Sequence, residues 1–123
     1  MSLPRLSGVV LGSRDPQALA AFYEAFLGWV RVDDEPGWVK LEPPGGGTGV
    51  SFQGEPDHVP PVWPGGPGDQ QMQLHLDVEV ADLETETARA VSLGAVVAEH
   101  QPQDDVRVLL DPAGHPFCIW VPS

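Results

Sequence analysis

The sequence places an imidazole and a carboxylate where they could act on a small molecule. His75 and Asp77 lie two residues apart in a run, residues 71–80, that alternates polar and apolar side chains. A β-strand points successive side chains to opposite faces, so His75 and Asp77 share one face. An imidazole can act as a general base near neutral pH. The spacing therefore predicts a candidate catalytic base at His75, although a strand histidine satisfied by its neighbours fits the same pattern.

Cys118, the single cysteine, is the other reactive group. A cysteine in an apolar run is more often a small buried residue than a nucleophile. A reactive thiol needs a nearby cation to lower its pKa, and His75 or Arg107 could supply one. Both interpretations of Cys118 stay open at this point.

The same alternation assigns further residues to the face that does not form the core. Lys40 and Arg107 are two of only six basic residues and could clamp a carboxylate or a phosphate, or pair with acidic neighbours. In residues 105–110, Arg107 and Leu109 are assigned to the pocket face and Val108 and Leu110 to the core.

Trp38 and Trp120 could stack on a planar ligand or fill a dimer seam. Besides His75, the predicted ligand-binding residues are Trp38, Lys40, Ser51, Gln53, Gln73, Asp77, Arg107, Cys118 and Trp120. Such a mixed aromatic and polar lining is typical of a small-molecule pocket, and a solvated outer sheet face is the alternative.

These residues belong to two copies of one structural unit. Residues 9–28 and 76–94 both read as a β-prone run, an aspartate, an amphipathic helix and a Leu-Gly pair. Asp15 and Asp82 are the expected helix N-caps, and Gly28 is an expected C-terminal glycine. The predicted strands are residues 6–11, 29–33, 37–42 and 49–53 in the first copy, and 71–80, 95–100, 105–110 and 116–121 in the second. We expect one α+β domain over residues 1–123, with module one at 5–54, a linker at 55–70 and module two at 71–122. Its helices pack on one face of the sheets, and the site lies where the copies meet.

Composition limits the function classes. The 123 residues carry a formal net charge of −12, which argues against binding nucleic acid or anionic membranes. No apolar run is long enough to span a bilayer, and the N-terminus lacks a signal-peptide pattern. One cysteine excludes an internal disulfide framework and an all-cysteine metal cluster. These features predict a cytoplasmic protein.

Four segments in order resemble the vicinal oxygen chelate superfamily, also called the glyoxalase/bleomycin-resistance/dioxygenase family. They are AFYEAFLG at 21–28, HLDVEVADLE at 75–84, LGA at 93–95 and DPAGHPFCIW at 111–120. The chain looks most like the small actinobacterial glyoxalase-like group. The resemblance implies paired βαβββ modules around a U-shaped cleft, and a homodimer.

The resemblance also implies a metal site that this sequence does not preserve. Metal-using members bind one divalent cation through His or Gln, Glu, His and Glu. The matching positions hold Gly8, Gln53, His75 and Cys118, so only His75 keeps the expected ligand. Hard cations prefer carboxylate oxygens, and none stands at these four positions. We therefore expect no metal and no other cofactor.

The leading hypothesis is a small-molecule-binding protein of this superfamily without a catalytic metal, whose partner is a small organic compound, as in bleomycin-binding relatives. One alternative is a lyase or isomerase that uses His75 as base, with Arg107 or Lys40 holding an anionic substrate. The others are a metal-dependent glyoxalase or dioxygenase, and a pure interaction domain.

Overall fold

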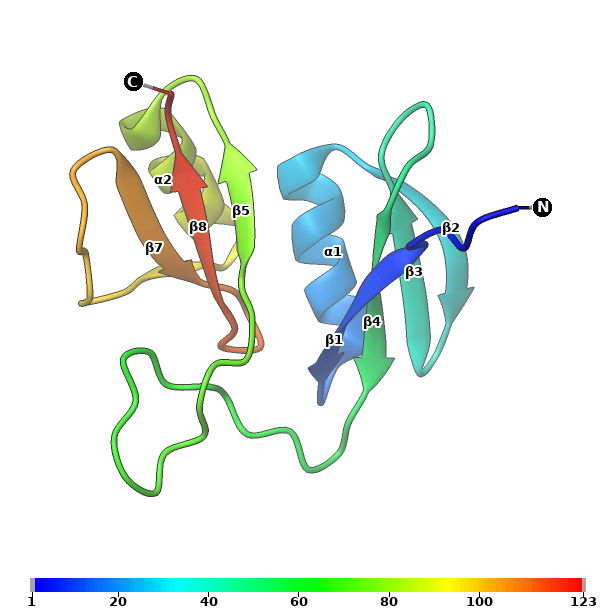
Figure 1. Cartoon of the computed structure of the whole chain (residues 1–123), viewed down its shortest axis with the longest axis horizontal. Helices are drawn as coiled ribbons and strands as arrows, with labels where there is room; N and C mark the ends of the chain where they lie inside the picture. Colours follow the sequence, from blue (N-terminus) through cyan, green and yellow to red (C-terminus); the bar gives the residue numbers. More distant parts are fainter. Residues whose placement is uncertain (1, 123) are drawn as a thin grey trace. The chain divides into compact units, whose positions relative to one another are not determined.

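The structure, a computed structural model, describes residues 2–122 and contains two compact units. One unit runs to His58 and the other begins at Val59. Each holds four strands and one helix, in the order strand, helix and three strands (Figure 1). The predicted α+β architecture of two similar βαβββ modules is therefore confirmed.

The first unit is a four-stranded sheet with a helix packed on one face. Its strand order is β1-β4-β3-β2, with β1 parallel to β4 and the other neighbours antiparallel. Helix α1 packs on β3, β4 and β1. The elements are β1 (Gly8–Ser13), α1 (Pro16–Leu27), β2 (Val30–Glu35), β3 (Trp38–Glu42) and β4 (Gly49–Gly54).

Helix α1 begins and ends where its sequence predicts. The Asp15 carboxylate accepts a hydrogen bond from the Ala18 amide at 3.0 Å, and Pro16 occupies the first helical position. Gly28 ends the helix with a φ of 69°, a conformation that glycine adopts without steric cost. The buried side of the helix includes Leu19 and Tyr23, each 1% exposed. The core of this unit therefore lies between α1 and the sheet.

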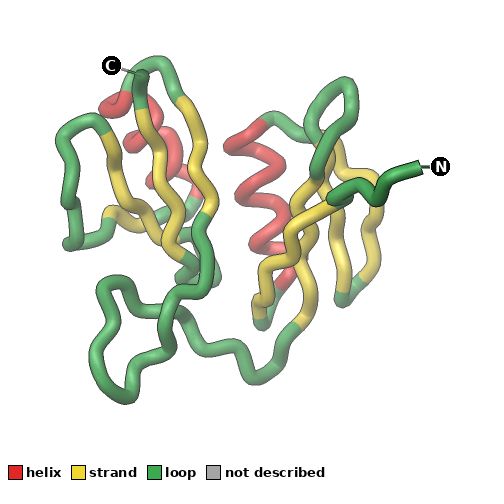
Figure 2. Tube along the Cα trace, viewed as in Figure 1, coloured by secondary structure: helices red, strands yellow, loops and turns green. Residues whose placement is uncertain are grey.

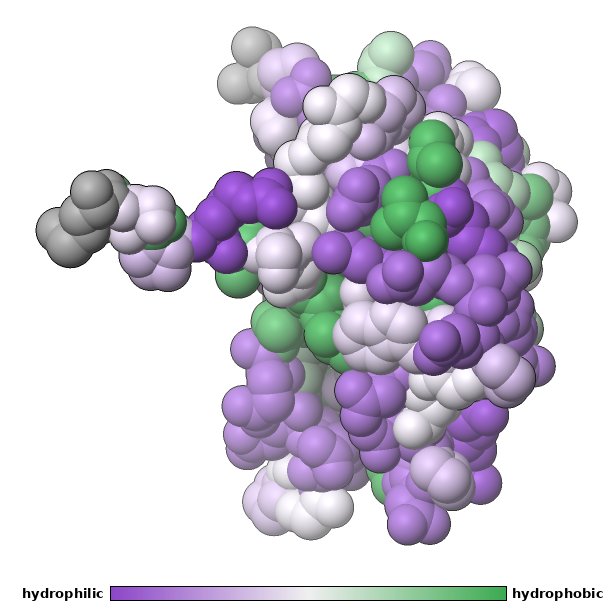
Figure 3. All heavy atoms as spheres, turned by 90° about the vertical axis from the view of Figure 1, so that its right-hand side faces the viewer, coloured by the Kyte–Doolittle hydropathy of each residue, from purple (hydrophilic) through white to green (hydrophobic). Residues whose placement is uncertain are grey.

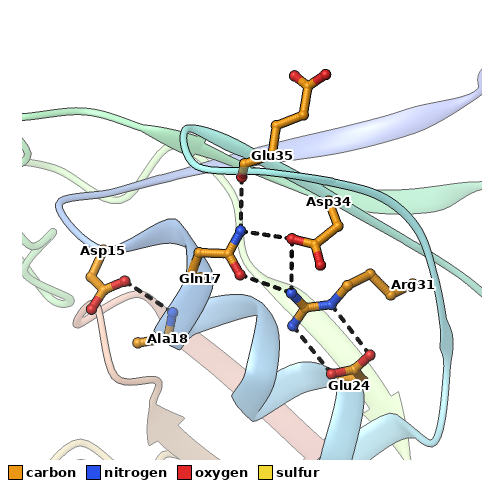
Figure 4. Close-up of polar contacts among 7 residues, drawn as sticks. All are labelled: Asp15, Gln17, Ala18, Glu24, Arg31, Asp34 and Glu35. Atoms are coloured by element: carbon orange, nitrogen blue, oxygen red, sulfur yellow. Dashed lines mark hydrogen bonds and ion pairs between the residues drawn. The ribbon is translucent and has the colours of Figure 1, made fainter.

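A polar network joins the edge strand β2 to α1 (Figure 4). The Arg31 guanidinium pairs with Glu24 of the helix at 3.2 Å and donates to the Gln17 side-chain oxygen at 2.9 Å. Gln17 in turn donates to Asp34 at 2.8 Å and to the Glu35 carbonyl at 2.7 Å. Because one guanidinium contacts two positions on the helix, the network fixes β2 against α1.

The second unit repeats this plan. Its strand order is β5-β8-β7-β6, with β5 parallel to β8, and α2 packs on β6, β7 and β8. The Asp82 carboxylate accepts from the Thr85 amide at 2.9 Å at the start of α2, and the hydrogen bonds from Thr85 lower the pKa of Asp82. The elements are β5 (Leu76–Glu79), α2 (Leu83–Leu93), β6 (Val96–Val97), β7 (Val106–Leu110) and β8 (Pro116–Trp120).

The fifth strand is shorter than the predicted run of residues 71–80. It covers only Leu76–Glu79, and the chain from β4 to β5 is drawn as a loop in Figure 2. Leu76 pairs with Phe117 in β8, whose first residue is Pro116. Residues before Leu76 have no strand partner there, since β8 begins at a proline that lacks a backbone N–H. As a result Leu74, predicted to face the core, is 52% exposed.

The surface agrees with the acidic composition. The face seen in Figure 3 is mostly hydrophilic, with only small, separate hydrophobic areas. Within residues 2–122, no helix is long and apolar enough to cross a membrane.

Thr87 on α2 offers a test of the packing of the second unit. Its hydroxyl oxygen is buried and has no hydrogen-bond partner among the described residues. An unsatisfied buried hydroxyl costs free energy, so we expect Thr87→Val to raise the free energy of unfolding by about 1 kcal/mol. Urea denaturation measures the change. Thr85→Val is the matched control, since Thr85 is exposed and bonds to Asp82, and it is expected to destabilise. A loss of stability in Thr87→Val would contradict the prediction.

Candidate functional site

The register of the second sheet decides which side chains share its helix-free face. Asp77 of β5 and Val108 of β7 both pair with Cys118 of β8. Trp120 pairs in the same way with Glu79 and Val106. Directly opposed residues point to the same side of a sheet, so these six side chains lie on one face. The alternate residues Leu109, Phe117 and Ile119 are 0% exposed and form the core with α2.

A pocket of about 320 Å³ opens on this face. Its volume is at the lower end of the range of small-molecule sites. It lies entirely within the second unit, and its walls come from the sheet, from the loop after β6 and from the segment that precedes β5. The lining residues are Trp63, His75, Asp77, Pro102, Gln103, Val106, Val108, Cys118 and Trp120.

Two loops are fixed against the pocket by specific contacts. The Gln101 side chain donates to the Ala98 and Val108 carbonyls, each at 2.9 Å, and accepts from the Val108 amide at 3.0 Å. This holds the neighbouring Pro102 and Gln103 beside β7. The proline-rich segment before β5 packs by Pro60 against Gly114, where an added Cβ would lie 2.6 Å from the Pro60 Cβ.

The proline-rich segment also brings an indole to the predicted histidine. Trp63 stacks on His75 with ring centroids 5.1 Å apart and an interplanar angle of 22°. His100 meets the same indole edge-on at 5.2 Å. His75 Nε2 lies 3.1 Å from the Asp77 carboxylate, and the His75 side chain is 29% exposed. The imidazole is thus oriented by a carboxylate on one side and an aromatic ring on the other.

The Cys118 thiol is neutral at physiological pH. It is 4% exposed, and burial, followed by the negative charge of Asp77, raises the pKa of Cys118 to about 11. Both effects disfavour the thiolate, which is the nucleophilic form. Of the two interpretations of this residue, the structure favours the small buried one.

The predicted face of Arg107 is wrong. Arg107 pairs with Ile119, and Leu109 pairs with Phe117, so both lie on the helix side of the sheet. The guanidinium donates to the Asp104 and Val106 carbonyls at 3.0 and 2.9 Å. The alternation failed because residues 108–110 are apolar on both faces, and such a run does not reveal which side faces the core. Arg107 is therefore not brought together with His75 or Cys118.

Four other predicted residues come together on the first sheet. Trp38 pairs with Gln53 and Lys40 with Ser51, so these side chains share the face opposite Val39 and Leu41, which are 0% exposed. Ser51 is only 2% exposed, and Lys40 pairs with Glu42 at 3.5 Å. The Trp38 indole donates to Asp33 at 3.3 Å, and the Gln53 amide donates to Glu55 at 2.7 Å. Gln73, by contrast, is exposed and lies outside the strands.

Sequence reasoning missed five residues that line the pocket, namely Trp63, Pro102, Gln103, Val106 and Val108. Val108 was assigned to the core by the same error that misplaced Arg107, and Val106, which was not assigned, lies on the same face as Val108. Trp63 lies in a segment of five prolines without periodicity, so no pattern indicated its position. A tryptophan within such a polar, proline-rich segment was the available signal, since this residue is rarely left in water.

The donor set does not fit the divalent cation implied by the resemblance. Gly8 has no side chain, and the Gln53 amide is exposed and bonded to Glu55. His75, Asp77 and Cys118 do have ligand atoms within 4.8 Å of one another. However, Asp77 is not one of the family positions, and it is the only carboxylate of the three, whereas hard cations prefer several oxygen ligands.

Comparison with known families identifies the family to which the chain belongs. Residues 8–120 match the model of the glyoxalase-like domain. The chain therefore belongs to the glyoxalase-like domain family, within the vicinal oxygen chelate superfamily, as its sequence predicts. The narrower actinobacterial group stays a prediction. No curated protein is significantly similar to the chain.

Solved structures share this fold at low identity. A glyoxalase/bleomycin resistance protein/dioxygenase family enzyme from Burkholderia phytofirmans is 20% identical, with a TM-score of 0.71 over 96% of this chain and 98% of that one. TnmS3, an antibiotic binding protein from Streptomyces sp. CB03234, is 20% identical, with a TM-score of 0.63 over 100% and 99%. A glyoxalase-related enzyme from Fulvimarina pelagi is 20% identical, with a TM-score of 0.69 over 98% and 89%.

The raised pKa of Cys118 predicts an inert thiol. Each pKa unit is tenfold in the ionised fraction, so at pH 8 a rise from 9.0 to about 11 reduces the thiolate about a hundredfold. We expect iodoacetamide to alkylate the native protein at least that much more slowly than the urea-unfolded chain, measured by mass spectrometry. Asp77→Asn is expected to speed the reaction of the native protein, because it removes the smaller of the two effects. Native and unfolded rates that are equal would contradict the prediction.

Proposed function

We propose that this chain binds a small organic molecule in the pocket of its second unit and does so without a catalytic metal. The observation that carries the proposal is the 320 Å³ pocket, which combines two tryptophans with the His75–Asp77 pair. Aromatic walls with a few oriented polar groups are the usual lining of a small-molecule site. Trp63 and Trp120 supply contact area for the ligand. His75 and Asp77 supply the polar groups that orient it.

The helix-free face of the first sheet belongs to the same proposal. Trp38, Lys40, Ser51 and Gln53 are proposed as further ligand-binding residues, since they share one face and include an indole, a cation and an amide. The TnmS3 structure, described as an antibiotic binding protein, supports binding as a role for this fold. That the protein is a cytoplasmic homodimer is part of the proposal and rests on the composition and the family resemblance.

The pocket predicts binding of a planar aromatic compound that depends on Trp120. We expect 2-naphthamide, which is neutral and planar, to bind the full chain in an isothermal titration. Trp120→Ala removes a stacking surface and is expected to weaken binding about tenfold. Trp29→Phe, a substitution in the other unit, is the matched control and is expected to leave the affinity unchanged.

Removal of divalent cations by a chelator is the second part of this test. Because no step of the proposal uses a metal, EDTA is expected to leave the affinity for 2-naphthamide unchanged. A loss of binding on chelation, restored by one divalent cation per chain, would show that the proposal is wrong about the metal. An affinity unaffected by Trp120→Ala would show that the pocket is not the site.

The His75–Asp77 contact favours a second candidate, a lyase or isomerase in which His75 is the general base. A carboxylate 3.1 Å from Nε2 orients the imidazole, and an oriented imidazole can act as a general base. Arg107 does not support the anionic substrate of this candidate, since it lies on the helix side of the sheet.

A measurement of turnover distinguishes the binding protein from the lyase or isomerase. If the chain only binds, compounds from a metabolite extract incubated with it are recovered unchanged, as measured by mass spectrometry. If it is a lyase or isomerase, some compound is converted by the wild type and by Asp77→Asn at a reduced rate, but not by His75→Gln. The melting temperature of His75→Gln is expected to stay close to that of the wild type, because His75 is partly exposed.

A further inference from the structure

We propose that the pocket of the second unit selects a planar aromatic group that carries a positive charge. This inference rests on the proposed binding function and adds the class of ligand. It is the reverse of the anionic substrate that the basic residues of the sequence suggest.

The charges of the pocket are negative. Asp77 lines it, and Glu79 lies on the same face of the sheet, opposite Trp120. Asp104 and Asp105 follow Gln103 directly in the loop that forms one wall, and both are exposed. Within this lining, His75 Nε2 lies 3.1 Å from the Asp77 carboxylate.

The basic side chains of the second unit do not line the pocket. Its sequence contains two, Arg89 and Arg107. Arg89 lies on α2, where it pairs with Glu86 at 2.8 Å. Arg107 lies on the helix side of the sheet and donates to two backbone carbonyls. None of the residues that line the pocket in the described chain is lysine or arginine.

The walls of the pocket favour a flat cation over a compact one. Trp63 and Trp120 offer indole rings, which attract a cation held against their π-faces. Val106 and Val108 are apolar, so the body of the ligand must be apolar as well. The Asp77 side chain is 61% exposed and can meet a charged group at the opening while the aromatic body lies inside. An aromatic amidine or a protonated heteroaromatic amine fits this combination.

Three compounds of one shape and different charge test the inference. The probes are 2-naphthamidine, which is cationic at pH 7.5, neutral 2-naphthamide and anionic 2-naphthoate, titrated calorimetrically into the full chain at low salt. We expect the amidine to bind about tenfold more tightly than the naphthoate, with the amide between them. The difference is expected to shrink at high salt, because exposed charges are screened.

Two variants with the same change in charge locate the effect. Asp77→Asn is expected to weaken the amidine about fivefold and the amide by less than that, because an exposed ion pair contributes modestly and the amide carries no charge to form one. Glu84→Gln alters the net charge equally but lies at the start of α2, outside the pocket, and is expected to change neither. Amide binding that is retained in Asp77→Asn also shows that the variant is folded.

The outcomes separate the ligand class from the binding function. Equal affinities for all three probes, or tighter binding of the naphthoate, overturn the charge preference and leave the proposed function standing. An amidine affinity that falls equally in Asp77→Asn and Glu84→Gln also overturns it, because the effect is then one of net charge. Absence of binding by all three probes overturns both proposals.

Discussion

The pairing of β8 between β5 and β7 is the constraint on which the second unit depends. This strand is buried on both faces, and each of its residues from Phe117 to Trp120 is matched to a residue of both neighbours. On the core side of β8, Phe117 and Ile119 pack against helix α2. The other side necessarily brings Cys118 and Trp120 beside Asp77 and Val108. A slip of one residue would exchange the two faces, so the packing that stabilises the fold also determines the composition of the pocket.

The same burial determines the chemistry of the pocket. Withdrawing Cys118 from water keeps its thiol protonated, and the charge of Asp77 acts in the same direction. What is left for a ligand is a carboxylate at the opening, an imidazole between that carboxylate and the Trp63 ring, and apolar walls. A site of this kind is suited to recognition by shape and charge more than to attack by a nucleophile. Among the described residues that line the pocket, the His75–Asp77 pair is the element on which proton transfer could be built.

The fold could be predicted from the sequence because its signals are local and occur twice. Asp15 and Asp82 mark helix starts, Gly28 and Gly94 mark helix ends, and every predicted strand is found to within a few residues except the run 71–80. The site could be predicted only in part. Strand alternation correctly grouped Cys118 with Asp77, because residues 76–79 alternate cleanly. It failed at Arg107, because Val108 and Leu109 are both apolar and both buried, and the register that separates them is set by β8. No periodic pattern indicated the position of Trp63, since that position depends on packing against His75 and His100.

The two faces of each sheet are under different constraints, which explains why the family is evident in this chain while its usual metal ligands are not. Residues on the helix side, such as Leu109 and Phe117, fill a core in which a change of one methylene is felt. Residues on the opposite side lie outside the core between helix and sheet, so the packing of that core constrains their identity less. Gly8, Gln53 and Cys118 stand at positions of this second kind. A carboxylate at Asp77, two residues from His75 along the chain, places a negative charge on this face even without the family's ligands. The scaffold is therefore retained while the chemistry on its open face is free to diverge.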